Sequence, residues 1–235
     1  MKVIVGGCSV SDSFANDPET DSVYGQILAT RLGADYVHHA ASAGSNYRIW
    51  RKITQMAMNN EITKDDIVVM QYTELTRQEF WSASDQREGQ DWKDKYNKDS
   101  NGGNIVRYKN NTSIFNGRSS EEKKFFELKE KYFTSIKFDE ERFEYHHYLF
   151  HNLMMSKDIN VAYLVSPNRP LRKYSWDDRH LFNKNDELHV TLSQDNDEHL
   201  RHLDDGSIDY VHFGKKGHKY VATVLEDFIK EKGWQ

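Results

Sequence analysis

Two patterns of hydrophobic positions alternate along the chain. Short apolar runs bounded by glycine or polar residues are typical of strands that are covered on both faces of a sheet. Longer segments in which apolar residues recur every three or four positions are typical of amphipathic helices. Such an alternation predicts a parallel sheet with helices on both faces. The predicted strands are residues 1–5, 34–39, 65–73 and 159–167, and the predicted helices are residues 23–32, 46–58 and 215–232.

The predicted helices have recognisable ends and faces. Gly33 is a natural stop for the first helix. In the second helix, the spacing puts Ile49, Ile53 and Met56 or Ala57 on one face. The same spacing predicts that the last helix directs five residues inward, which are Tyr220, Val221, Val224, Leu225 and Phe228.

Residues 76–158 interrupt the alternation. The part from 77 to 118 is polar and rich in Asn, Asp, Lys and Gly, which predicts a long, partly irregular excursion over the site. Ser119 and Glu122 have the spacing of a capping box, and the sequence then turns helical. A second helix is predicted to end near Ser156, beginning about Glu140. We therefore predict a single domain over the whole chain, with a largely helical insertion.

Small or polar residues directly follow three of the predicted strands. These residues are Ser9, Gly44 and Thr73. In open parallel sheets, binding and catalytic sites collect at the carboxyl ends of the strands. The three residues are therefore predicted to lie along one edge of the sheet.

A potential catalytic pair stands just before the last predicted helix. Asp209 and His212 are three residues apart, a spacing that would let the carboxylate reach the imidazole on a single turn. An Asp that holds one ring nitrogen fixes the tautomer and leaves the other nitrogen to accept a proton from a hydroxyl. A serine at a strand end, such as Ser9, needs a base of this kind to be a nucleophile. His218 is the competing base, but the spacing favours His212, and we expect His218 to face the first turn of the last helix.

The only cysteine of the chain, Cys8, precedes Ser9 directly. One interpretation is a reactive thiol, and the other is a small buried residue beside the first strand. Nothing near Cys8 in the sequence would lower its pKa, so we expect the buried residue. A single cysteine also excludes an internal disulfide and a thiolate-rich metal site.

The order of these blocks resembles that of the SGNH (GDSL-like) hydrolases. The first block of that family is typically G-D-S, the second contributes a glycine, and the fifth is D-x-x-H followed by a glycine and a helix. The matching residues are Gly7-Cys8-Ser9 for the first block, Gly44 for the second, and Asp209, His212 and Gly217 for the fifth. The resemblance covers the two ends of the chain and the third strand, and it does not extend to residues 76–158.

The resemblance implies a three-layer α/β/α, flavodoxin-like fold and assigns the nucleophile to Ser9, with His212 as base and Asp209 orienting it. The backbone N–H groups of Ser9 and Gly44 would hold the oxyanion. The third block of the family is typically G-x-N-D, whose Asn donates to the oxyanion. Here the chain reads Gln71-Tyr72-Thr73-Glu74, which puts Thr73 at that position, and Asn46 is the alternative donor.

Composition and charge limit the kinds of partner that the protein is expected to bind. The formal net charge of −5 gives no basic surface for nucleic acid. No segment approaches the roughly 20 apolar residues of a membrane helix, and the first residues do not form a signal peptide. We expect neither nucleic acid nor membrane as a partner, and a cytoplasmic location, which a virion protein would also fit. His147 and His151 share a helix face, but no third ligand accompanies them, so we expect no metal and no cofactor.

We interpret the sequence as that of a serine esterase or O-deacetylase that cleaves a small acyl ester, with a small molecule or a glycan as substrate. The carbohydrate substrate follows from the resemblance alone. An O-acyltransferase with the same residues is an alternative, because an insertion that excludes water would favour transfer. A third interpretation, from another class, is a non-catalytic glycan-binding or structural module of the phage type. The sequence leaves the acyl group, the alcohol and the oligomeric state open.

Overall fold

The computed structural model describes the parts of the chain that form the sheet, its covering helices and two small strand pairs. The described residues are 1–8, 11, 23–40, 45–73, 77–81, 103–107, 136–165, 187–189, 200–202 and 208–234. For 77–81, 103–107, 136–140, 165, 187–189, 200–202 and 208–211, only the backbone is described. The predicted capping box of Ser119 and Glu122 lies outside the described residues, as do Ser9 and Gly44.

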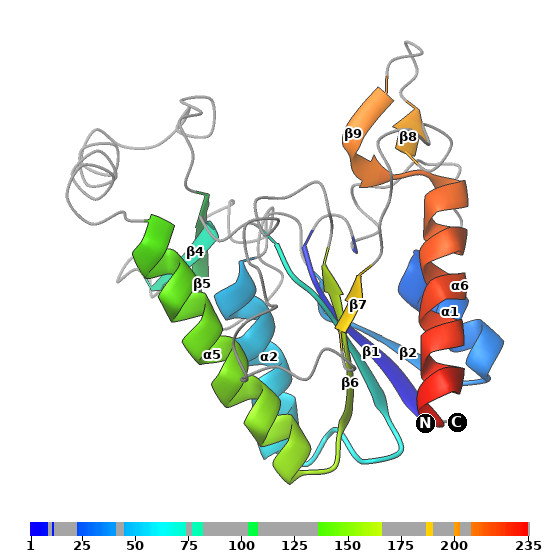
Figure 1. Cartoon of the computed structure of the whole chain (residues 1–235), viewed down its shortest axis with the longest axis horizontal. Helices are drawn as coiled ribbons and strands as arrows, with labels where there is room; N and C mark the ends of the chain where they lie inside the picture. Colours follow the sequence, from blue (N-terminus) through cyan, green and yellow to red (C-terminus); the bar gives the residue numbers. More distant parts are fainter. Residues whose placement is uncertain are drawn as a thin grey trace, which may run out of the picture.

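Five parallel strands form the main sheet (Figure 1). Their order, β2-β1-β3-β6-β7, changes direction at β1, as in flavodoxin-like sheets. The predicted α/β class and parallel sheet are therefore confirmed. The strands are β1 (Lys2–Gly6), β2 (Asp35–His38), β3 (Ile67–Gln71), β6 (Asn160–Val165) and β7 (Glu187–His189).

Helices cover both faces of this sheet, which completes the three layers. Figure 1 shows α2 and α5 on one side of the strands and α1 and α6 on the other. The bounds of α2 are as predicted from the apolar spacing, and so are those of α6, whereas α5 begins four residues before the predicted start. The helices are α1 (Tyr24–Leu32), α2 (Asn46–Met58), α5 (Ile136–Ser156) and α6 (Lys215–Lys232).

Alternate residues of β1, β3 and β6 enter two separate apolar clusters. In β3, Ile67 and Val69 pack with α1 and α6, whereas Val68 and Met70 pack with α2 and α5. Side chains alternate between the two faces of a strand, so a fully apolar strand contributes to both clusters. Every residue of β3 is buried, as expected for a central strand.

The helices end and pack where the sequence allows it. Gly33 closes α1 in the left-handed conformation, with φ of 62°. Gly6 allows α2 to approach β1 closely, because a Cβ there would lie 2.8 Å from Cγ2 of Ile49. The predicted inward face of α6 is buried at Val221 and Leu225, whereas Tyr220 is 38% exposed, so the prediction for Tyr220 was wrong.

Two antiparallel strand pairs lie beside the main sheet. The first consists of β4 (Arg77–Trp81) and β5 (Gly103–Arg107), in a segment for which the sequence predicted no strands. The second consists of β8 (Leu200–His202) and β9 (Ile208–Phe213), which leads directly into α6. Within the described part of the chain, no helix is long and apolar enough to cross a membrane.

Candidate active site

The carboxyl ends of β1 and β3 lie side by side at one edge of the sheet. Gly6 of β1 pairs with Met70 of β3, so the next residues, Gly7 and Gln71, are neighbours across the two strands. A Cβ on Gly7 would lie 3.4 Å from the Cβ of Gln71. Ser9 stands three residues after the end of β1 in the sequence, and its placement lies outside the described residues.

The segment after β1 turns tightly. The Ser11 N–H donates to the carbonyl oxygen of Cys8 over 3.0 Å, and both residues are fully buried. A Cβ on Gly7 would lie only 2.3 Å from the Ser11 Oγ, so a larger residue at this position would displace the turn. Cys8 packs in the apolar cluster on the α1 and α6 face, as expected for a buried cysteine.

Tyr24, the first residue of α1, is hydrogen-bonded to this turn through its hydroxyl. Its hydroxyl lies 2.8 Å from the Ser11 Oγ and donates to the Oε1 of Gln71 over 3.3 Å. All three side chains are fully buried. Burial raises the pKa of the Tyr24 phenol above its ordinary value, so the hydroxyl remains a hydrogen-bond donor. The turn after β1, the first turn of α1 and the end of β3 are thereby joined by one buried polar network.

His218, in the first turn of α6, joins the same network. Its Nδ1 accepts the backbone N–H of Tyr24 over 3.2 Å, and its ring stacks on the tyrosine ring. Burial lowers the pKa of His218 to about 4, with the nearby His212 as the second cause. The imidazole is therefore neutral at pH 7, with its proton on Nε2 and its Nδ1 lone pair occupied. His218 is thus fixed as a structural residue, and His212 remains the candidate base.

His212 lies half-buried near the end of β9. The next residue, Phe213, packs in the same apolar cluster as Cys8, the residue before Ser9. Phe213 also stands edge-on against His218, whose partner Tyr24 is bonded to Ser11, so β9 and the turn after β1 are linked through these side chains.

Asp209 and His212 do not lie on a turn, as the sequence analysis expected, but in one extended strand. Three residues of a strand span about 10 Å, and side chains three apart belong to opposite faces. The side chain of Asp209 lies outside the described residues. The expected turn was therefore wrong, and the orienting role of Asp209 stays a prediction.

The two candidate oxyanion donors, Asn46 and Thr73, are bonded to each other. The Nδ2 of Asn46 donates to the carbonyl oxygen of Thr73 over 3.0 Å, and its Oδ1 accepts the Thr73 N–H over 2.8 Å. Both residues are buried. Asn46, the first residue of α2, thereby clamps the end of β3, and one N–H of its amide is not used in this pair.

Two histidines of α5, His147 and His151, lie on the α2 and α5 face of the sheet. His147 is hydrogen-bonded to the Tyr72 hydroxyl, and the Nδ1 of His151 lies 3.0 Å from the Tyr163 hydroxyl. Burial lowers the pKa of His147 to about 3, with His151 as the second cause. Among the described residues, no group of three or more metal-binding side chains comes together. The two histidines share a helix face as predicted, and tyrosines contact them.

Comparisons with known proteins add little to this picture. No protein-family model matches the sequence, and no curated protein matches it significantly. Among solved structures, the chain is similar to the crystal structure of a candidate acylhydrolase from Bacteroides fragilis, at 10% sequence identity and a TM-score of 0.44. That alignment covers 100% of this chain and 88% of the other. The fold assignment rests on the strand order and the layers described above.

Proposed function

We propose that the protein is a serine hydrolase that cleaves small acyl esters, with Ser9 as nucleophile and His212 as base. The observation that carries the proposal is the chain of contacts from Phe213, next to His212, through His218 and Tyr24 to Ser11, in the turn after β1. The carboxyl edge of the sheet is where parallel α/β folds place their chemistry. O-acetylated carbohydrates are the first substrate class to test.

In the proposed reaction, the Ser9 Oγ attacks the ester carbonyl carbon while Nε2 of His212 takes its proton. The resulting oxyanion is held by the backbone N–H groups of Ser9 and Gly44. When the tetrahedral intermediate collapses, the C–O bond to the alcohol breaks and His212 gives the alcohol its proton. Water, deprotonated by His212, then attacks the acyl-enzyme and releases the carboxylic acid and Ser9. Asp209 would orient the imidazole throughout.

Asn46 is the better candidate for the third oxyanion donor. The sequence left this role between Thr73 and Asn46. The reciprocal bonds with the Thr73 backbone fix the Asn46 amide in place, and one of its two Nδ2 hydrogens goes to Thr73. A donor that is positioned before the reaction begins is what oxyanion stabilisation requires. We propose that the second hydrogen serves the oxyanion.

The decisive experiment is the intact mass of the protein after incubation with a fluorophosphonate, which loses fluoride as an activated serine bonds to phosphorus. Wild type, Ser9→Ala, Cys8→Ala and His212→Ala are compared. We expect one adduct on wild type and Cys8→Ala, and none on Ser9→Ala or His212→Ala. Circular dichroism shows that each variant is folded. An adduct on Ser9→Ala, or a folded wild type with no adduct, would contradict the proposal.

Two further comparisons separate the related functions. If the protein reacts with the probe, fresh protein without the probe is given an acetyl ester. Release of acetate into water, with or without a sugar acceptor present, identifies a hydrolase. Transfer of the acetyl group to the acceptor identifies an O-acyltransferase. A folded protein with no adduct that binds glycans in calorimetry is a binding module. Asp209→Asn is measured separately, because a strand does not give the one-turn contact on which its role was predicted.

A further inference from the structure

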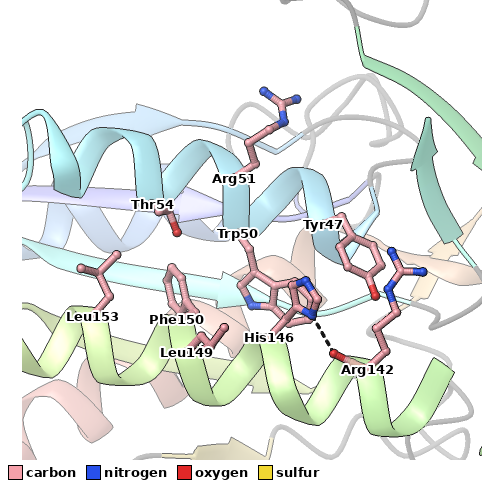
Figure 2. A pocket seen from close by; sticks show the side chains of 9 residues that line it. All are labelled: Tyr47, Trp50, Arg51, Thr54, Arg142, His146, Leu149, Phe150 and Leu153. Atoms are coloured by element: carbon pink, nitrogen blue, oxygen red, sulfur yellow. Dashed lines mark hydrogen bonds between the residues drawn. The ribbon is translucent and has the colours of Figure 1, made fainter. Parts of the chain in front are cut away.

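A cavity of about 430 Å³ lies between α2 and α5, on the face of the molecule away from α1 and α6. This volume is within the range of small-molecule sites. Nine side chains line it, and Figure 2 shows Trp50 of α2 against His146 of α5, with Tyr47 near Arg142. The nine are Tyr47, Trp50, Arg51 and Thr54 of α2 and Arg142, His146, Leu149, Phe150 and Leu153 of α5.

The cavity is polar and cationic at one end. The Arg142 guanidinium lies 4.4 Å above the centre of the Tyr47 ring. The His146 Nδ1 is bonded to the carbonyl oxygen of Arg142 over 2.8 Å, and the His146 ring stacks against Trp50. In the described part of the chain, no carboxylate lies within ion-pair distance of Arg142. This end therefore presents a positive charge that is held over an aromatic ring.

The other end of the cavity is apolar. Phe150 is 3% exposed and forms part of its floor, whereas Leu149 is 48% exposed. With Leu153, these residues lie on one face of α5, about two to three turns beyond Arg142, because residues seven, eight and eleven apart align on a helix. The strip from the cation to Leu153 runs along about 16 Å of helix.

The charge of the lining differs from that of the molecule. The chain has a formal net charge of −5, yet the cavity is lined by two arginines, one histidine and, among the described residues, no aspartate or glutamate. A ligand that fits must therefore be anionic at one end and apolar along its length. Guanidinium and carboxylate match in geometry as well as charge.

We propose that this cavity binds a medium-chain aliphatic carboxylate, whose carboxylate pairs with Arg142 and whose chain lies along Leu149, Phe150 and Leu153. The site lies on the α2 and α5 face of the sheet and does not depend on the proposed hydrolysis. A linear chain suits a lining that extends along one helix face. Tyr47 supports the guanidinium from beneath, and Trp50 and Phe150 exclude water from the floor.

The test uses two probes of the same size, octanoate and octanamide, and isothermal titration calorimetry on the full chain. We expect wild type to bind octanoate at least tenfold more tightly than octanamide, because a charge-assisted pair forms only with the anion. Arg142→Gln should remove this difference and leave octanamide binding unchanged. Arg31→Gln, on α1 at the opposite face of the sheet, is the matched control and should bind like wild type. Equal binding of the two probes by wild type would overturn the proposal.

Two more variants locate the bound chain. Leu149→Asn should weaken both probes severalfold, because it removes apolar surface from the tail region and keeps the cation. Ser9→Ala should bind octanoate like wild type. Loss of octanoate binding in Ser9→Ala would place the ligand at the candidate active site and contradict a separate cavity. Since no readout depends on catalysis, this result is independent of the fluorophosphonate experiment.

Discussion

Tyr24 is hydrogen-bonded to three residues from different segments of the chain, which are Ser11, Gln71 and His218. Its hydroxyl and backbone N–H contact residues that are 13, 47 and 194 positions away in the sequence. A tyrosine at the start of an amphipathic helix is ordinarily an apolar contact, so these bonds were not predicted. Long-range polar networks of this kind depend on the tertiary fold and cannot be predicted from local spacing.

Replacement of Tyr24 by Phe should destabilise the protein by about 1–3 kcal/mol. The change keeps the ring but leaves the Ser11 hydroxyl and the Gln71 Oε1 buried without this partner, which costs their desolvation. The free energy of unfolding in urea measures the effect. Tyr148→Phe, at an exposed position of α5, is the control and should be neutral within about 0.5 kcal/mol. Equal effects of the two changes would show that the network contributes nothing.

His218 should make the stability depend on pH. Its folded pKa of about 4 lies below its ordinary value of 6.5, so the unfolded chain binds a proton where the folded chain does not. Its contribution is therefore complete above pH 6.5 and is lost as the pH falls toward 4, by roughly 3 kcal/mol. Asn at this position keeps an acceptor for the Tyr24 N–H but does not titrate.

Urea unfolding of wild type and His218→Asn between pH 7 and pH 4 measures this dependence. The variant should lose less stability than wild type over that range, even if it is less stable at pH 7. Parallel curves would mean that folding does not shift the pKa of His218, which would contradict this expectation. His147, with a folded pKa of about 3, titrates in both proteins and cancels in the comparison.

At the scale of secondary structure, the sequence predicted best the elements whose environment is uniform along their length. α2 and α6 have one continuous apolar face each, and their predicted bounds agree with the structure. β9 was missed because Asp209 and His212 interrupt its apolar pattern, and a D-x-x-H motif suggested a turn. β4 and β5 pair with each other rather than with the main sheet, so neither has the long apolar run of a central strand.

The junction of α2 with β3 should be sensitive to one side chain. Asn46→Ala leaves the N–H and the carbonyl oxygen of Thr73 without their partner in a buried site, at a cost of about 2–4 kcal/mol for two bonds. Ser45→Ala, the adjacent change, removes only the cap on the Arg48 N–H and should cost about 1 kcal/mol. Chemical denaturation of both variants checks the order.

At the scale of the whole molecule, each apolar cluster of the core is built from residues that are far apart in the sequence. The cluster on the α2 and α5 face draws on residues between Ile4 and Tyr163. The cluster on the α1 and α6 face needs both Val3 and Ile229. This topology explains why the fold class could be predicted from the alternation of strands and helices, while the contacts of the site could not, since they join segments from opposite ends.

The face of the sheet that α1 shares with α6 therefore remains only partly covered until α6 is in place. During synthesis, Val69 and Leu164 would belong to an apolar surface that is complete only when Val221 and Leu225 join it. A chain without residues 214–235 should bind the dye ANS and collect in the insoluble fraction on expression. A monodisperse truncated chain with native circular dichroism would contradict this expectation. Folding of the sheet should therefore depend on the synthesis of α6, and exposure to chaperones should be longest just before this helix emerges.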